Sequence, residues 1–143
     1  MSKNIQILDC TLRDGGLGLE DAEKNDLSHV RFSKNDYRIT AGYLADSAID
    51  IIELGSIEIT SDDRTGFCIY KNIEDISKQM PLKKKQNQMF AALYRGPDTP
   101  IDDIPKWNPS LCEAVRVIIR YSELQKSLDF CAALSSKGYK VFV

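Results

Sequence analysis

The chain has 143 residues, a formal net charge of −2 and 43% apolar residues. This length and composition suit one domain with a buried core, and the near-neutral charge excludes a strongly basic nucleic-acid-binding surface. The sequence also excludes a membrane protein, because no apolar stretch reaches spanning length and no signal peptide is recognisable. The four cysteines are widely spaced, without a Cys-x-x-Cys pair, which predicts free thiols in a reduced, cytoplasmic protein.

The amino-terminal segment predicts a strand followed by a long loop. Residues 4–13 are rich in aliphatic side chains with mixed alternation, so we expect a strand there. Asp14-Gly15-Gly16 breaks this pattern and predicts a sharp turn. Residues 17–31 are polar and acidic without a sustained period, which favours a long loop.

A helix and a second strand are expected next. Ser33-x-x-Asp36 resembles a capping box, in which a carboxylate replaces the usual Glu or Gln. Apolar residues then follow at helical spacing, which indicates one buried stripe: Tyr37, Ala41, Leu44, Ala45 and Ala48. Residues 49–55 have the pattern of a short buried strand. Strand, helix and strand in this order predict a βαβ unit, and such units form parallel sheets.

The same unit repeats. Asn72 is placed to cap a helix that Pro81 ends, and residues 89–94 predict a third strand. Two prolines within residues 101–112 predict a short or broken helix. Residues 114–119 predict a fourth strand.

The last segment predicts a capped helix and the start of a fifth strand. Ser122-x-x-Gln125 has the form of a second capping box, and Gly138 stands where a helix would end. The expected buried stripe of this helix is Leu124, Leu128, Cys131 and Leu134. Residues 139–143 begin a fifth strand, and the sequence stops inside it.

The ending indicates a piece of a longer protein. Strands with apolar residues on both faces are typical of a sheet covered by helices, and a sheet that stops in an apolar strand leaves an open edge. The alternative is a complete five-stranded open sheet with a short last strand. Open strand edges and part of an exposed core predict a homo-oligomer.

The chemistry-bearing residues gather at the end of the first strand. A period of two places four residues on one face of this strand: Ile7, Asp9, Thr11 and Arg13. The turn at Asp14 lets Arg13 and Asp14 reach the same edge, and carboxyl ends of parallel strands are where active sites form. Gly15 and Gly16 are expected to permit the turn and to leave room for a ligand.

A second charged residue is expected on the neighbouring strand. Ile51, Glu53 and Gly55 share one face, and a carboxylate among aliphatic residues needs a partner. Arg13 is the candidate partner of Glu53. Two interpretations stay open at this point: an arginine held beside a metal-binding carboxylate, and a structural ion pair near a strand end.

The segment Ile7-Leu8-Asp9-Cys10-Thr11-Leu12-Arg13-Asp14-Gly15-Gly16 closely resembles the opening strand of the DRE-TIM metallolyases, the family of 3-hydroxy-3-methylglutaryl-CoA lyase. It is most similar to the branch that contains 4-hydroxy-2-oxovalerate aldolase. Residues 45–55, 115–117 and 137–143 support the resemblance. It implies an α/β fold of parallel βα repeats in which residues 1–143 are the amino-terminal half of one (β/α)8 TIM-barrel domain.

The resemblance also implies a chemistry. Asp14 matches the ligand of a divalent metal, magnesium or manganese; Arg13 matches the arginine that steadies an enolate oxygen; and Glu53 matches the residue that orients this arginine. The implied reaction is retro-aldol cleavage of a small 4-hydroxy-2-oxo acid. An acyl-CoA condensing enzyme is the alternative within this chemistry, and a non-catalytic assembly or binding module is the alternative outside it.

Three positions bear on how far the family's chemistry applies. The family completes its metal site with a His-x-His pair from a later strand, but His29 is the only histidine here and lies in the acidic segment. Leu17 stands where the aldolases have an acid–base histidine. We therefore expect this chain alone to hold metal weakly and to be inactive. Arg120, after the fourth strand, has two open interpretations: a contact with a substrate carboxylate, and a surface arginine.

Overall fold

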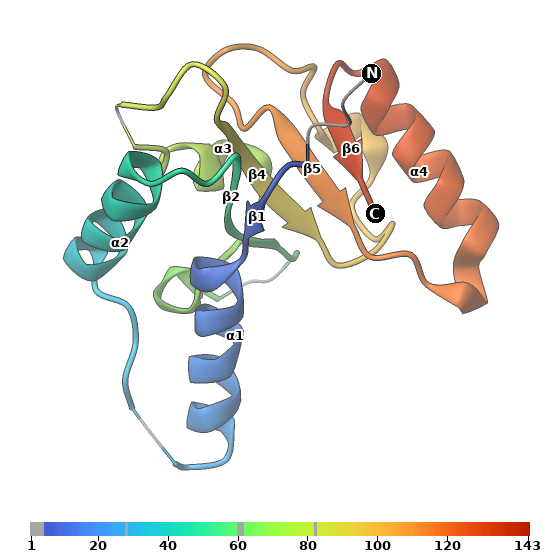
Figure 1. The fold of residues 1–143 in the computed structure, drawn as a ribbon. Coiled ribbons are helices and arrows are strands. Elements are labelled where there is room, and N and C mark those ends of the chain that lie inside the picture. The colour runs from blue at the N-terminus through green and yellow to red at the C-terminus, as the bar shows by residue number, and fades with distance from the viewer. Residues whose placement is uncertain (1–4, 28, 60–61, 82) are drawn as a thin grey trace.

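The computed structural model describes residues 5–27, 29–59, 62–81 and 83–143, and it has an α/β fold with a curled, parallel sheet. Within these residues, six strands form one sheet in the order β1-β2-β4-β5-β6, and β3 also pairs with β2. All of the pairings are parallel, and the sheet curves into a half-barrel (Figure 1). The strands are β1 (Leu8–Asp9), β2 (Ile51–Ile57), β3 (Ile69–Tyr70), β4 (Met89–Tyr94), β5 (Ala114–Val117) and β6 (Lys140–Phe142).

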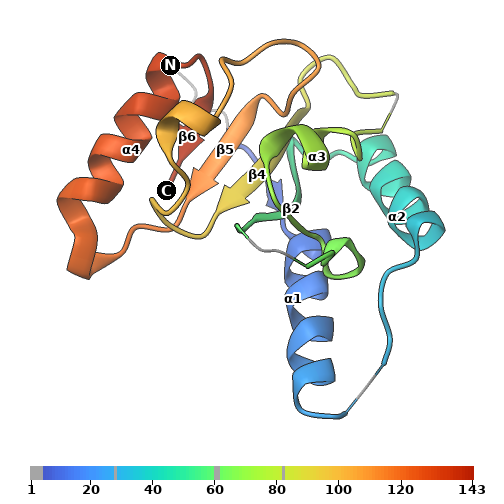
Figure 2. The same ribbon diagram turned by 180° about the vertical axis from the view of Figure 1, so that it is seen from behind.

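Three helices cover the outer face of the sheet, as the views from both sides show (Figures 1 and 2). They are α2 (Lys34–Asp46), α3 (Ile73–Ser77) and α4 (Leu124–Ser136). The helix α1 (Thr11–Lys24) instead projects from the end of β1, away from the sheet. Short 3₁₀ turns are η1 (Thr65–Phe67), η2 (Ile101–Asp103) and η3 (Tyr121–Glu123). Among the described residues, no helix combines the length and apolarity that crossing a bilayer requires.

Side chains alternate between two apolar clusters along the strands. The larger cluster lies between the sheet and the outer helices, and it includes Ile52, Phe90 and Val115. The smaller cluster lies on the other, inner face and consists of Ile51, Met89, Ala91 and Ala114, with Leu8 and Phe142 packed against it. Both faces of the central strands are therefore buried, which explains their nearly continuous apolar sequences.

The helix α2 forms with the predicted capping box, but it ends at Asp46, so Ala48 of the predicted stripe lies outside the helix and is exposed. The Ser33 hydroxyl accepts a hydrogen bond from the Asp36 amide at 3.1 Å, and the Asp36 carboxylate accepts one from the Ser33 amide at 3.2 Å. The side chains of Tyr37, Ala41 and Ala45 are buried along one stripe. The Tyr37 hydroxyl donates to the Leu54 carbonyl at 2.9 Å, which fixes this helix against β2.

The predictions for the amino-terminal segment are wrong in three respects. The strand ends at Asp9 rather than at residue 13, residues 14–16 form no tight turn, and residues 17–24 are helical rather than a loop. The Asp9 carboxylate accepts hydrogen bonds from the Thr11 amide at 2.9 Å and the Thr11 hydroxyl at 3.0 Å, which supports the first turn of α1. A buried stripe of Leu12, Gly16 and Glu20 then packs the helix.

Gly16 serves a different purpose from the one expected. A Cβ at this position would lie 1.9 Å from the Phe67 carbonyl oxygen, so the helix approaches η1 closely only because residue 16 lacks a side chain. The room at Gly16 is filled by the protein's own backbone and not by a ligand. Tertiary packing has therefore outweighed the weak helix propensity of this glycine-containing segment.

The predicted capping box of α4 is also wrong, and its predicted buried stripe is correct at Leu134 and partly at Cys131 but not at its other two positions. The helix begins at Leu124 without a side-chain cap, and η3 occupies the residues before it. Its buried residues are Ser127, Phe130 and Leu134, whereas the predicted Leu124 and Leu128 are 45% and 48% exposed. The helix is thus rotated from the predicted orientation.

The strand β3 was not expected from the sequence. Its two residues pair with Ser56 and Ile57 at the end of β2, while β1 pairs with Ile51 and Ile52 at the beginning. The register of β2 against β4 shifts between Glu53 and Ser56. A Cβ on Gly55 would lie 2.3 Å from the Cys68 carbonyl oxygen, so glycine is required for the close approach of the chain that forms β3.

Candidate functional site

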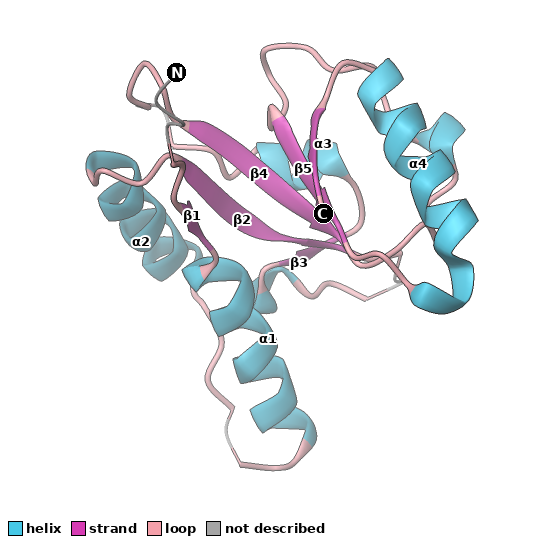
Figure 3. Ribbon diagram, turned by 45° about the vertical axis from the view of Figure 1, so that its right-hand side comes forward, coloured by secondary structure: helices cyan, strands magenta, loops and turns pink. Residues whose placement is uncertain are grey.

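Charged side chains collect on the inner face of the sheet, in the first half of β2 and toward the end of β5. Glu53 of β2 follows Ile51 on this face, and Arg116 of β5 follows Ala114. The helix α1 starts just beyond the end of β1 (Figure 3), and the hydrogen bond from Arg13 to Glu53 places this side chain against β2. One buried acid and two arginines from distant parts of the sequence are thus brought together.

The Glu53 carboxylate is held by both arginines. Its side chain is completely buried, and Oε1 accepts a hydrogen bond from Arg13 Nε at 2.6 Å. Arg116 donates from Nε to Oε2 and from Nη2 to Oε1, both at 2.8 Å. The pairing of Arg13 with Glu53 is therefore confirmed, although Arg13 reaches Glu53 from a helix and not from the predicted strand. We call Arg13, Glu53 and Arg116 the inner cluster.

The two guanidinium groups of the inner cluster are balanced by two carboxylates. Arg13 and Arg116 face Glu53, Arg13 also pairs with the Asp14 carboxylate, and the side chains of Arg13 and Arg116 keep exposed fractions of 13% and 27%. Burial lowers the pKa of Arg13, but hydrogen bonding and the charge of Glu53 outweigh this effect and raise it. Hydrogen bonding to Glu53 raises the pKa of Arg116. Both arginines therefore stay charged, and both remain partly accessible to a small anion.

Two further side chains border the inner cluster. Asp14 forms an ion pair with Arg13 through Nη1 and has a side chain that is 61% exposed. Cys10 Sγ lies 3.9 Å from Arg116 Nη2. Burial raises the pKa of this thiol first, and the charge of Glu53 raises it further, so Cys10 is protonated at neutral pH. A neutral thiol at this place is a poor nucleophile.

The described residues do not supply a complete metal site. They contain no group of three or more His, Cys, Asp or Glu side chains arranged to hold a metal ion. Both oxygens of Glu53 are occupied by arginines, which leaves Asp14 as the one exposed carboxylate beside the inner cluster. His29 is exposed in the segment after α1. A divalent cation would therefore need ligands beyond those that the described residues provide.

A second set of arginines surrounds a cavity of about 650 Å³ at the carboxyl edge of the sheet. We call it the mouth pocket, and its lining includes Glu58, Arg64, Arg95, Asp98, Ile118 and Arg120. The residues that directly follow β2, β4 and β5 are Glu58, Arg95 and Ile118, respectively. Arg120 thus borders a cavity at the edge where active sites of parallel sheets form.

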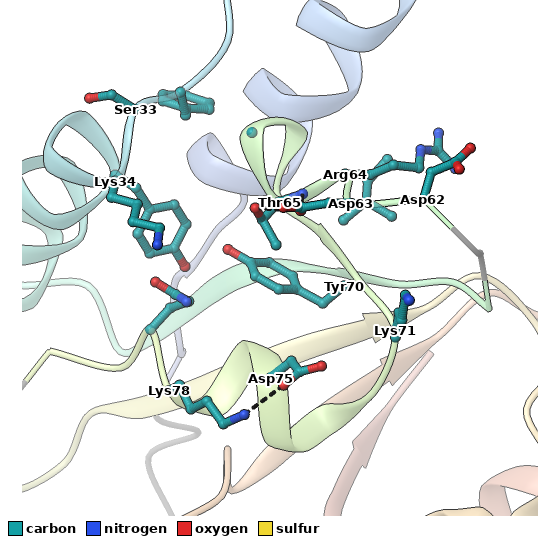
Figure 4. A pocket seen from close by; sticks show the side chains of 15 residues that line it. Ser33, Lys34, Asp62, Asp63, Arg64, Thr65, Tyr70, Lys71, Asp75 and Lys78 are labelled. Carbon is teal, nitrogen blue, oxygen red and sulfur yellow. Dashed lines mark hydrogen bonds and ion pairs between the residues drawn. The ribbon is translucent and has the colours of Figure 1, made fainter.

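Another pocket, of about 470 Å³, lies on the outer side of the sheet between α2, η1, β3 and α3. Figure 4 shows the Tyr70 hydroxyl pointing into it, with Lys34 on the opposite wall and the ion pair of Lys78 with Asp75 at its border. Arg64 directs its guanidinium away from this pocket (Figure 4). The sheet separates this outer pocket from the inner cluster, so we do not assign the chemistry of the inner cluster to the pocket.

Sequence reasoning did not identify every charged residue at these sites. Arg116 was overlooked as a site residue, although a charged side chain inside an apolar strand, in phase with Ala114, was a usable signal. Arg64 had no such signal, because it precedes η1, which no periodicity predicts. Ser56 also escaped notice: its hydroxyl is buried on the inner face without a hydrogen-bond partner among the described residues.

Comparisons of this chain with known protein families, with curated proteins and with solved structures found no match. The resemblance of residues 7–16 to the metallolyases therefore rests on those residues. The geometry independently defines a class of site: a buried carboxylate that holds two arginines on the inner face of a parallel half-barrel. Such a site is suited to bind and stabilise an oxyanion.

Proposed function

We propose that this chain is the amino-terminal half of a (β/α)8-barrel carbon–carbon lyase that cleaves a 4-hydroxy-2-oxo acid by a retro-aldol reaction. The observation that carries the proposal is the inner cluster, in which fully buried Glu53 holds Arg13 and Arg116. The parallel half-barrel supports it, because barrels of this type place their active sites at the carboxyl ends of the strands.

The reaction develops negative charge on an oxygen, and the inner cluster has two guanidinium groups that can donate hydrogen bonds to it. A base removes the proton of the C4 hydroxyl, the C4 oxygen forms a carbonyl as the C3–C4 bond breaks, and C4 leaves as an aldehyde or ketone. The electron pair of the C3–C4 bond moves through C3 and C2 to the C2 oxygen. The resulting enolate takes up a proton at C3 and becomes a 2-oxo acid. Arg13 is the proposed donor to the developing C2 oxyanion, and Arg116 is the proposed donor to the neighbouring carboxylate.

Glu53 is proposed as a positioning residue. A guanidinium has donors in a rigid plane, so fixing Nε of both arginines on one carboxylate directs their remaining N–H groups. This arrangement is formed before the substrate arrives, so little reorganisation is needed during the reaction. Removal of one such donor typically lowers the rate by about 10²- to 10³-fold.

Asp14 is the proposed contribution of this chain to a magnesium or manganese site. Its exposed carboxylate lies beside Arg13, which is the position that the metallolyase resemblance implies for a metal ligand. Because the other ligands are not among the described residues, we assign no step of the reaction to a metal. The acid–base group is likewise not assigned, since Leu17 has no titratable group.

The proposal is tested by measuring pyruvate release from 4-hydroxy-2-oxo acids, and acyl-CoA consumption in parallel, with the full-length protein. Arg13→Lys keeps the charge but loses the planar donors, so we expect pyruvate release to fall about 10²-fold or more. Arg38→Gln, on the exposed side of α2, is the control and should release pyruvate at the unmodified rate. Unchanged release by Arg13→Lys would contradict the proposal, and acyl-CoA consumption without pyruvate release would replace it with a condensing enzyme.

Binding to the 143-residue chain gives a second test. Oxalate is planar and doubly charged, as is the enolate of a 2-oxo acid. We expect calorimetric titration to detect oxalate binding that Arg13→Lys weakens and Arg38→Gln leaves unchanged. Equal oxalate affinity in the unmodified chain and Arg13→Lys would remove the inner cluster from the substrate site.

A further inference from the structure

The lining of the mouth pocket has more positive than negative side chains. It contains Arg64, Arg95, Arg120 and Lys24 against Glu58 and Asp98. Two carboxylates outside the lining also pair with these cations: Glu20 with Arg64 and Lys24, and Glu123 with Arg120. Glu58 Oε2 accepts a hydrogen bond from Arg64 at 2.8 Å and another from Arg95 at 2.9 Å. Two guanidiniums thus share one carboxylate oxygen. Burial lowers the pKa of Arg64, and the nearby charge of Arg95 lowers it further.

Arg120 is held in the pocket by the backbone. A Cβ at Gly96 would lie 2.5 Å from Arg120 Cζ, so glycine lets the guanidinium lie directly against the backbone, and the φ of +144° at Gly96 also favours glycine. Arg120 Nη2 donates to the Arg95 carbonyl at 2.8 Å, and Nη1 donates to Asp98 at 2.8 Å. The guanidinium is thus positioned before any ligand binds, which reduces the entropy lost on binding.

The mouth pocket begins close to the inner cluster. Arg116 pairs with Leu93, and Ile118 and Arg95 are each two residues farther along their strands. Two residues of an extended strand span about 7 Å, and side chains two apart lie on the same face. Ile118, which lines the mouth pocket and is 44% exposed, therefore lies between the arginine of the inner cluster and the arginines of the mouth pocket.

We propose that the mouth pocket binds a second anionic group of the substrate, so that the substrate is a 2-oxo acid with a carboxylate or a phosphate at its other end. This inference rests on the proposed function for the identity of the first group, which binds at the inner cluster. Arg95 and Arg120 hold the second group, Arg64 adds positive charge, and Ile118 contacts the carbon chain between the two ends.

The test uses small anions that occupy the two places separately. We expect inorganic phosphate and malonate to bind to the chain in calorimetric titrations, and Arg120→Gln and Arg95→Gln each to weaken this binding about tenfold. The same variants should bind oxalate with unchanged affinity, because oxalate requires Arg13. Arg38→Gln is the control for the loss of a charge, and circular dichroism verifies that each variant is folded.

The outcomes separate this inference from the proposed function. If phosphate and malonate bind equally to the unmodified chain and to Arg95→Gln and Arg120→Gln, the mouth pocket is not an anion site and the inference is wrong. If those variants weaken phosphate binding while Arg13→Lys leaves oxalate binding unchanged, the anion site stands and the proposed function fails. A stronger effect on phosphate than on malonate identifies the second group as a phosphate, and the reverse identifies a carboxylate.

Discussion

The inner face of the sheet has two levels with opposite character. Toward the amino ends of the strands, Ile51, Met89, Ala91 and Ala114 form a small apolar cluster, with Ala91 in register with Glu53. Two residues farther along β2 and β5, counted from Ile51 and Ala114, lie Glu53 and Arg116, joined by Arg13. The lower level holds the strands together, and the upper level presents charge. The two tasks are thus separated along each strand, and substitutions should affect stability and binding differently at the two levels.

The largest effect is expected for Glu53→Gln at the upper level. This change leaves two partly buried guanidiniums without their shared carboxylate, so we expect the free energy of unfolding to fall by about 3 kcal/mol. Oxalate binding should weaken as well, because both arginines lose their orientation. Urea denaturation and calorimetry measure the two effects. Glu74→Gln, on the exposed side of α3, is the control, and an equally small effect of both changes would contradict the positioning role.

A smaller loss of stability is expected for Met89→Ala at the lower level. Met89 is 7% exposed, and its truncation should cost about 2 kcal/mol of unfolding free energy, the low end for a core methionine, since this level lies in an open half-barrel. The variant should retain the oxalate affinity of the unmodified chain at temperatures where it is folded. A loss of oxalate affinity comparable to that of Arg13→Lys would show that the two levels are not separable.

The attachment of α1 is tested by two glycines of one helix. Gly16→Ala forces a Cβ against the Phe67 carbonyl, so we expect a loss of about 1 to 2 kcal/mol and a displacement of Arg13. Gly18→Ala is the matched control. Nothing lies within 4 Å of its added Cβ, and alanine favours the helix, so a gain of about 0.5 to 1 kcal/mol is expected. Thermal denaturation of both variants measures these changes, and opposite signs are the predicted result.

The pKa of the Cys10 thiol depends on the nearby charges of Glu53, Arg116 and Arg13. Its pKa is raised by burial and by Glu53, and the charge of Arg116 acts in the opposite direction. Cys10 therefore contributes to stability below the ordinary thiol pKa, and this contribution is lost as the pH rises through the raised value. In Arg116→Gln the pKa should rise further, so alkylation of Cys10 at pH 8 should slow while that of Cys131 stays unchanged. Peptide mapping by mass spectrometry measures both rates, and faster alkylation of Cys10 would contradict the arrangement.

The smallest effect is expected for self-association of the chain. The outer edges of β1 and β6 pair with no other strand among the described residues, and Tyr121 and Leu128 are exposed near β6. We therefore propose weak homo-oligomers at high concentration. Sedimentation velocity over a range of concentrations tests this, and a single monomeric species throughout would contradict it.

The sequence predicted the central sheet better than its borders. Strands β2, β4, β5 and β6 and helix α2 were predicted because each has a strong local signal, such as an apolar run or a capping box. Helix α1 was not, because its buried stripe contains Gly16 and Glu20, which no hydrophobic pattern marks. Its packing depends on the close approach to η1, which is a tertiary contact. The short strand β3 was missed for the same reason.

The candidate site was predicted in part. The ion pair of Arg13 and Glu53 was predicted by placing both residues at the ends of adjacent strands. Arg13 lies in α1 and not in a strand, but the ion pair still forms because α1 starts close to β2. Arg116 completes the arrangement and is 63 positions away from Glu53 in the sequence. The mouth pocket is formed by three loops whose conformations carry no periodic signal, so of its arginines only Arg120 was considered.

The edge of β2 is divided between two short strands, and this division has a consequence for regulation. β1 pairs with the beginning of β2 and β3 with its end, and Gly55 and Gly16 both fit closely against the chain around Phe67 and Cys68. A partner or modification that shifts this chain segment is expected to move α1, and with it Arg13, relative to Glu53. The proposed oxyanion binding would then depend on the outer surface around η1, on the opposite side of the sheet.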